Sequence, residues 1–142
     1  MIVPGAMQSL HALAQASCDT GVAPELIDMV HLRASQINGC SVCVMMHTAD
    51  LRKRGESEDR ITAVSAWRET PYFTDAERAA LALTESVTRL ADTPDPVPDP
   101  IWDAAAAHYD ESQLAGLLLA IAGINVWNRL NAATRQMAGT AW

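Results

Sequence analysis

Apolar residues recur along most of this chain at the spacing of α-helices. In the segment 24–38, Leu26, Val30 and Ile37 fall on one helical face, and Arg33 is the only polar residue on that stripe. No segment shows the period-two alternation of a half-buried strand. The pattern therefore predicts an all-α protein.

Capping residues and helix breakers divide the chain into about seven helices. Asn38-Gly39 separates the second helix from the third, and Thr74 with Glu77 forms a capping box at the start of the fifth. The proline-rich segment 92–100 is expected to be a rigid loop inside one domain, because neither flank could fold alone. The predicted helices cover residues 7–17, 24–38, 41–54, 58–67, 75–90, 101–109 and, starting at 110 or 112, a segment that ends near 137. We expect a single domain that spans residues 1–142.

The last predicted helix is apolar almost all round between Leu114 and Trp127. Such a helix either lies at the centre of the fold or packs against another subunit. Asn125 and Asn128 interrupt this surface and need hydrogen-bond partners, for which a subunit boundary is one candidate place.

Composition and charge narrow the class of protein. The 142 residues are 49% apolar and 19% charged, as in a folded globular domain, and the net charge of −7 without any basic run argues against nucleic-acid binding. A secreted disulfide scaffold usually has more than three cysteines and an even number of them. The N-terminus does not read as a signal peptide, and the longest apolar run, 114–124, is shorter than the roughly 20 residues that cross a bilayer. We therefore expect a cytoplasmic protein with no nucleic-acid or membrane partner.

The candidate chemistry lies in residues 36–47, which read Gln-Ile-Asn-Gly-Cys-Ser-Val-Cys-Val-Met-Met-His. Cys40 is expected at the mouth of a helix and Cys43 in its first turn, close enough to close a disulfide. His47 follows Cys43 by four residues and should share its helical face. Because a helix N-terminus and a basic ring both favour a thiolate, the pattern predicts a lowered pKa for Cys43.

Other uses of these residues are weaker. The two cysteines could be small core residues, or Cys40, Cys43 and His47 could bind structural zinc together with Asp28 or His31. The spacing fits one helical face better than a zinc knuckle, and no second Cys-x-x-Cys is present. A c-type haem would need a histidine directly after the second cysteine, and a thioredoxin fold would need a strand before the motif. We predict no bound metal or cofactor.

Further residues match one known family. The matching segments are 32–47, 50–55, 66–68, 74–83 and 125–130. On these residues the chain resembles the AhpD-like alkylhydroperoxidase branch of the carboxymuconolactone decarboxylase superfamily. The resemblance implies an all-helical domain with a two-helix catalytic hairpin, assembled as a homo-oligomer, a trimer or hexamer. It also implies thiol peroxidase or disulfide-exchange activity.

The family pattern assigns roles to residues of this chain. Cys43 would attack the oxidant, Cys40 would resolve the product, and His47 would act as the base. The family carboxylate stands twelve residues before the first cysteine and is usually Glu; here it is Asp28, so we expect a bridging water between it and the histidine. Val42 occupies the place of a second histidine in characterised AhpD proteins, so part of their proton relay is missing.

The sequence thus predicts a thiol-dependent hydroperoxide reductase or disulfide oxidoreductase in antioxidant defence. Its partner would be a small hydroperoxide or a protein disulfide, and an external dithiol, such as a dihydrolipoyl group, would restore the thiols. The alternatives are a redox-sensing or binding module with negligible turnover, and a decarboxylase-type member of the superfamily. The dithiol argues against the decarboxylase.

Some other polar residues have a less definite place. His31 and Ser35 lie on the same side of their helix as Asp28, so they either line a pocket or lie at the surface. Cys18, His11 and His108 belong to no recognisable group of catalytic or ligand residues.

Overall fold

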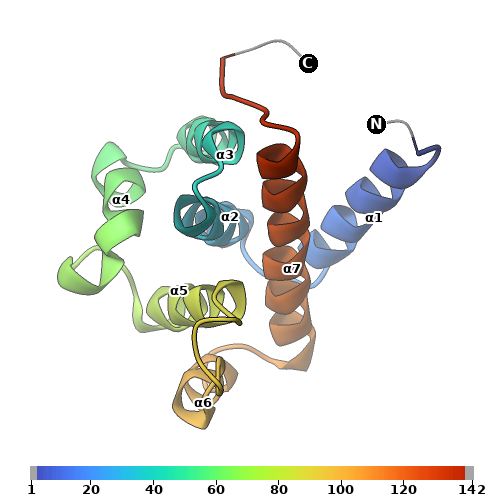
Figure 1. Cartoon of the computed structure of the whole chain (residues 1–142). Helices are drawn as coiled ribbons and strands as arrows, with labels where there is room; N and C mark the ends of the chain where they lie inside the picture. Colours follow the sequence, from blue (N-terminus) through green and yellow to red (C-terminus); the bar gives the residue numbers. More distant parts are fainter. Residues whose placement is uncertain (1–2, 140–142) are drawn as a thin grey trace.

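The computed structural model describes residues 3–139, and the regular structure in this range is entirely helical, which confirms the all-α prediction (Figure 1). The helices are α1 (Ala6–Cys18), α2 (Pro24–Asn38), α3 (Ser41–Lys53), α4 (Glu58–Ala63), the 3₁₀ helix η1 (Val64–Glu69), α5 (Asp75–Thr88), α6 (Asp99–Ala106) and α7 (Glu111–Ala133).

Helix α7 is the central element of the fold, with α1 on one side and the remaining helices on the other (Figure 1). Leu117 and Ile121 of α7 are fully buried and pack in one cluster with Val30 of α2 and Leu83 of α5. This burial explains the nearly continuous apolar surface of the helix. Neither α7 nor any other helix in the described range is long and apolar enough to cross a membrane.

Helices α2 and α3 form a tight hairpin that presents the dithiol. Gly39 ends α2 with a φ of 67°, a left-handed conformation that glycine adopts without strain. The backbone N–H of Gly39 donates to Gln36 and that of Cys40 donates to Ser35, which together make a Schellman motif. Cys40 is therefore fixed directly at the start of α3.

The C-terminus of α7 differs from the prediction. The helix ends at Ala133 instead of near residue 137, because Arg135 turns into the left-handed region with a φ of 56°. The N–H of Arg135 donates to Ala132 and that of Gln136 donates to Asn131, so the helix closes with a second Schellman motif. No glycine marks this turn, and the sequence pattern therefore missed it.

Two further boundaries differ. The predicted helix 58–67 breaks into α4 and η1, and Ala66 within η1 has non-helical angles of φ −128° and ψ 32°. Helix α6 starts at Asp99, inside the predicted proline-rich loop. Pro100 is tolerated in the first turn, because backbone N–H groups there have no partner within the helix and a missing one costs no hydrogen bond.

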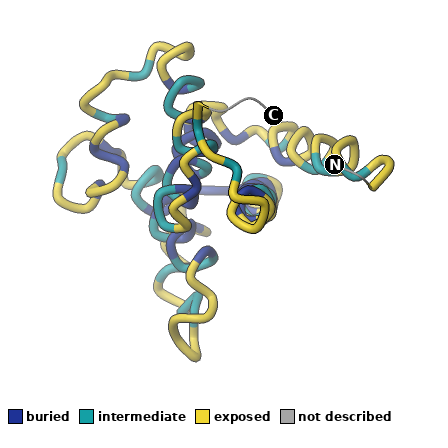
Figure 2. The backbone as a smooth tube through the Cα atoms, turned by 45° about the horizontal axis from the view of Figure 1, so that its top comes forward, coloured by how far each residue is buried: buried dark blue, intermediate teal, exposed yellow. Residues whose placement is uncertain are grey.

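Helix α1 is largely exposed and packs along α7 (Figure 2). The two segments approach closely where Thr20, just after α1, lies against Gly116 of α7; a Cβ atom at Gly116 would overlap the threonine side chain. This contact holds one end of α1 against α7, while the other end of the helix diverges from α7 (Figure 1).

A buried carboxylate joins α2, η1 and α5. Glu85 accepts hydrogen bonds from Arg33 at 2.8 Å, from the Trp67 indole N–H at 2.9 Å and from Arg68 at 2.5 Å. Burial alone would raise the pKa of Glu85, but the hydrogen bonds from these three partners outweigh it and hold the pKa below its usual value.

We expect the substitution Glu85→Gln to lower the free energy of unfolding by about 3 kcal/mol, because it leaves the buried Arg33 cation without its counter-charge. Urea unfolding at neutral pH measures the loss. The difference in free energy of unfolding between parent and variant should become smaller in acid, because Glu85 of the parent protein then takes up a proton. The matched control is Glu58→Gln, which removes a fully exposed ion pair with Arg52 and should change little. Equal effects of the two substitutions would contradict the assignment.

Candidate functional site

The two cysteines of the Cys-x-x-Cys motif lie together at the start of α3. Both are buried free thiols, and their Sγ atoms are 2.7 Å apart. Cys40 is the N-cap of the helix, and its sulfur accepts the backbone N–H of Cys43 at 3.4 Å. A disulfide between them therefore needs only a small side-chain movement.

The predicted lowered pKa of Cys43 is wrong. Burial, together with the hydrogen-bonded sulfur of Cys40, raises the pKa of the Cys43 thiol to about 11. The first-turn N–H expected to favour a thiolate is directed at Cys40 instead. The position of Cys43 in the sequence predicts that it lies in the first turn of a helix, but not how deeply its thiol is buried.

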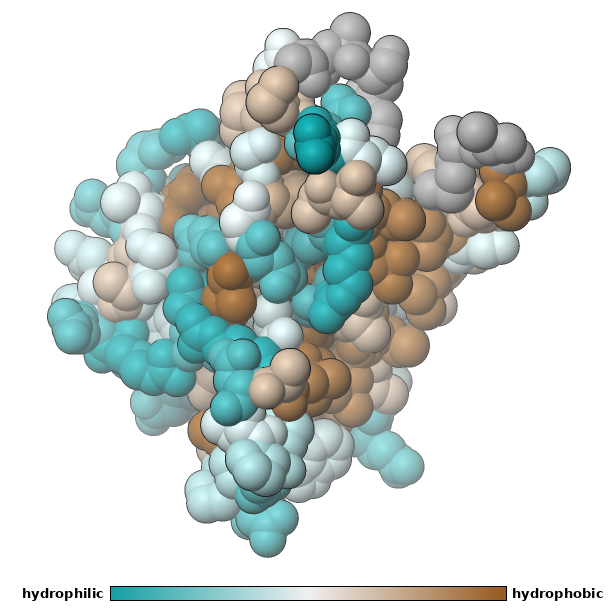
Figure 3. All heavy atoms as spheres, viewed as in Figure 1, coloured by the Kyte–Doolittle hydropathy of each residue, from teal (hydrophilic) through white to brown (hydrophobic). Residues whose placement is uncertain are grey.

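An apolar cavity of about 520 Å³ opens on Cys43. It lies between α1, α3 and α7, where the space-filling view shows hydrophobic atoms gathered along α7 and α1 (Figure 3). Cys43 and His47 both line it, whereas Cys40 does not. The apolar part of its wall includes Met7, Leu10, Val42, Leu119, Ile124 and Trp127. A ligand in this cavity would therefore lie against Cys43 rather than Cys40.

His47 is held by a buried carboxylate. Its Nδ1 lies 3.2 Å from Oδ1 of Asp28, and the other oxygen of Asp28 accepts a hydrogen bond from Arg54 at 2.7 Å. The contact is direct, so the expected bridging water is not needed. Burial by itself raises the pKa of Asp28, but the hydrogen bonds and charges of His47 and Arg54 outweigh it and keep the pKa below its usual value.

The second nitrogen of the His47 ring, Nε2, is buried and has no hydrogen-bond partner among the described residues. The carboxylate on Nδ1 favours the tautomer in which this nitrogen carries a lone pair. His47 thus carries an unused proton acceptor and lines the same cavity as Cys43, although no direct hydrogen bond joins the two side chains.

A second imidazole lies beside the first. The ring centroid of His31 is 4.6 Å from that of His47, and His31 also lines the cavity. Burial and the neighbouring His47 lower the pKa of His31 to about 3, so it is neutral at physiological pH. Ser35, one turn further along α2, is fully buried instead. The structure thus places His31 in the pocket and Ser35 in the core.

One group of side chains could in principle hold a metal ion. Ligand atoms of Asp28, His31 and His47 all lie within 4.8 Å of one another, and the cysteines do not belong to this group. The ligand set imagined for zinc, with Cys40 and Cys43, is therefore not the one that the described residues assemble. The guanidinium of Arg54 already neutralises the Asp28 carboxylate, which disfavours a second cation there.

Three asparagines on one face of α7 complete the site. Asn131 donates to Cys43 Sγ at 3.3 Å and to Cys40 Sγ at 3.6 Å. Asn125 and Asn128 accept hydrogen bonds from Asn38, so the partners expected at a subunit boundary are found within the chain. Asn131 was not predicted; the three-residue spacing of polar positions in an apolar helix was the available signal.

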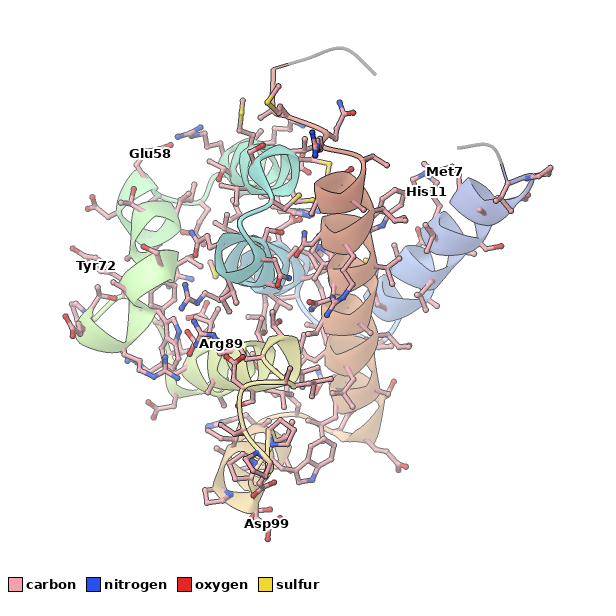
Figure 4. All side chains as sticks on the ribbon, viewed as in Figure 1. Met7, His11, Glu58, Tyr72, Arg89 and Asp99 are labelled. Atoms are coloured by element: carbon pink, nitrogen blue, oxygen red, sulfur yellow. The ribbon has the colours of Figure 1, made fainter. Side chains whose placement is uncertain are left out.

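Of the remaining candidates, two lie apart from the dithiol and one lines the cavity. Cys18 and His108 are exposed. His11 of α1, shown with Met7 in Figure 4, also lines the cavity, and its ring lies 5.8 Å from that of Trp127 on α7.

Comparisons with known proteins place the chain in a family. A model of the carboxymuconolactone decarboxylase family matches residues 4–86. The uncharacterised protein YdfG of Bacillus subtilis (strain 168) is 35% identical over 139 residues, which cover 98% of this chain and 93% of YdfG.

Two solved structures share the fold. ATU0492 of Agrobacterium tumefaciens, a protein of unknown function provisionally named an AhpD antioxidant defence protein, matches with a TM-score of 0.90 at 35% identity, over 98% of this chain and 94% of its own. The debrominase Bmp8, solved with 2,3,4-tribromopyrrole, has a TM-score of 0.83 at 20% identity, over 96% of this chain and 72% of its own, which is a likeness of fold alone. The family model and the 35% identity to ATU0492 show that the chain belongs to the carboxymuconolactone decarboxylase family, in its AhpD-like branch.

Proposed function

We propose that this protein is a thiol-dependent reductase of organic hydroperoxides. One observation carries the proposal: Cys43, one of two adjacent thiols, lines an apolar cavity together with His47, whose Nε2 has no hydrogen-bond partner among the described residues. A nucleophile, a base and a carboxylate that orients the base are the parts that covalent catalysis requires.

In the first step His47 takes the proton of the Cys43 thiol, through a water molecule or the bound substrate, while Asp28 stabilises the resulting imidazolium. The thiolate attacks the distal oxygen of the hydroperoxide. An S–O bond forms, the O–O bond breaks, and the departing alkoxide takes the proton back from His47 and leaves as an alcohol. Cys43 becomes a sulfenic acid.

In the second step Cys40 attacks the oxidised sulfur, 2.7 Å away in the reduced protein. The S–S bond forms, the S–O bond breaks, and hydroxide combines with the thiol proton of Cys40 to leave as water. An external dithiol, for which a dihydrolipoyl group is our candidate, then returns two electrons and two protons. The cycle consumes one hydroperoxide and one external dithiol.

The cavity favours a hydroperoxide with an apolar body over hydrogen peroxide. Hydrogen peroxide would leave most of the roughly 520 Å³ empty and gain nothing from its apolar walls. A partner protein's disulfide is less suited to the first step, because Cys43 itself is only 1% exposed. Assembly as a trimer or hexamer and a cytoplasmic location stay predictions.

A second candidate function is redox sensing with little turnover. The raised pKa of Cys43 and the valine at position 42 favour it, since both slow the formation of a thiolate. A sensor would form the disulfide once and change its assembly or surface, whereas a reductase would cycle with an added dithiol.

The order of attack is tested with single-cysteine variants and cumene hydroperoxide. We expect Cys40→Ser to accumulate a sulfenic acid at Cys43, detectable by trapping and peptide mass spectrometry, because the resolving thiol is gone. Cys43→Ser should lose turnover, and Cys18→Ser, which changes an exposed thiol, is the matched control. Full turnover in Cys43→Ser would refute the reductase. Stoichiometric oxidation without cycling would favour the sensor.

The pH dependence of Cys43 provides a separate test. Because only the thiolate reacts and the pKa of Cys43 is raised to about 11, its alkylation by iodoacetamide should rise about tenfold per pH unit through the weakly alkaline range. A free cysteine in solution levels off above about pH 8.5. Peptide-resolved mass spectrometry on the reduced protein measures the profile, and a plateau in the neutral range would contradict the raised pKa.

A further inference from the structure

Asn131 brings the end of the central helix to the dithiol. It lies in the last turn of α7, three residues before the cap Thr134, and its own carbonyl accepts the closing N–H of Gln136. The residue is only 5% exposed, and its side-chain N–H group donates to both sulfurs, at 3.3 Å to Cys43 and 3.6 Å to Cys40.

The rest of the asparagine face fixes this side chain relative to the hairpin. Asn38, the last residue of α2, donates to Asn125 at 2.9 Å and to Asn128 at 2.8 Å. Asn128 in turn donates to the hydroxyl of Ser35 at 3.1 Å. These bonds join α7 to the end of α2, next to Gly39 and the first cysteine. A network in which every member is bonded holds its groups in one geometry.

Few other groups act on the inner sulfur. Cys40 adds a second sulfur that disfavours a thiolate at Cys43, and Asn128 contributes a hydrogen bond that favours it. The titratable and charged side chains that face the same site are Asp28 and His31 of α2, His47 of α3, Arg54 beyond α3 and His11 of α1. From α7 the facing groups are neutral amides, and Arg129 is bonded to Asn125.

We propose that Asn131 is a catalytic residue, whose side-chain amide donates a hydrogen bond to the thiolate of Cys43 as it forms and to that of Cys40 as it attacks. The inference rests on the proposed use of this dithiol as a nucleophile. It supplies, from α7, a hydrogen-bond donor to both sulfurs.

The physical reason is the difference between two charge states of sulfur. A hydrogen bond to an ionised acceptor is roughly twice as strong as one to a neutral acceptor. The amide therefore stabilises the thiolate more than the thiol, and burial of both side chains strengthens this preference. Losing such a bond should reduce the thiolate population roughly 10- to 100-fold.

The experiment measures thiolate reactivity without any hydroperoxide. In the Cys40→Ser background, which leaves one thiol at the site, the alkylation rate of Cys43 by iodoacetamide is compared with and without Asn131→Leu and Asn131→Asp. Leucine removes the donor at similar volume, and aspartate places a carboxylate against the sulfur. The matched control is Leu130→Ala, which changes an exposed neighbour on the same helical turn.

We expect both Asn131 substitutions to slow alkylation by at least about tenfold, and the control to leave it unchanged. The direction separates this role from a structural one, because a loosened site would expose the buried thiol and speed alkylation. Equal or faster alkylation in the Asn131 variants would overturn the inference. Absence of hydroperoxide turnover in the parent protein would overturn the proposed function, and the alkylation comparison would still decide the role of Asn131.

Discussion

The structure of this site depends on one buried carboxylate. The carboxylate of Asp28 lies between His47 on α3 and Arg54 just beyond it, at 3.2 and 2.7 Å. Burial raises the pKa of Asp28, but the hydrogen bonds from His47 and Arg54 outweigh it and keep the carboxylate ionised, and the carboxylate in turn fixes the orientation of the imidazole. Without it the ring could turn, and the nitrogen that faces no protein partner would no longer be held beside the cavity.

Burial around this carboxylate has two opposing effects on the dithiol. The apolar lining of the cavity between α1, α3 and α7 suits an apolar ligand, but burial also raises the pKa of the Cys43 thiol to about 11. In the proposed mechanism, groups that act locally on the sulfur offset this rise. His47 of α3 would act as the base, and Asn131 of α7 would donate a hydrogen bond to the thiolate.

The sequence predicted most of the fold because its helices have strong local signals. The capping box at Thr74 and the stop at Gly39 are both used as expected, and of the two possible starts of α7 the structure uses Asp110 as the cap. The end of α7 was missed because Arg135 takes a left-handed turn that no glycine announces.

In the site, the spacing of Cys43 and His47 predicted that both lie on one helical face, since residues four apart share a face. In the structure both line the same cavity. The depth of burial, the direct Asp28 contact and the approach of Asn131 result from packing between α2, α3 and α7, and no local sequence pattern predicts them.

The most direct test of the role of Asp28 is the second-order rate of Cys43 oxidation by cumene hydroperoxide in the Asp28→Asn variant. Asparagine has nearly the same shape as aspartate but carries no charge. If the carboxylate orients and supports the base, the rate falls roughly 100-fold or more in a variant that keeps the helical content of the parent. An unchanged rate in the folded variant would contradict it.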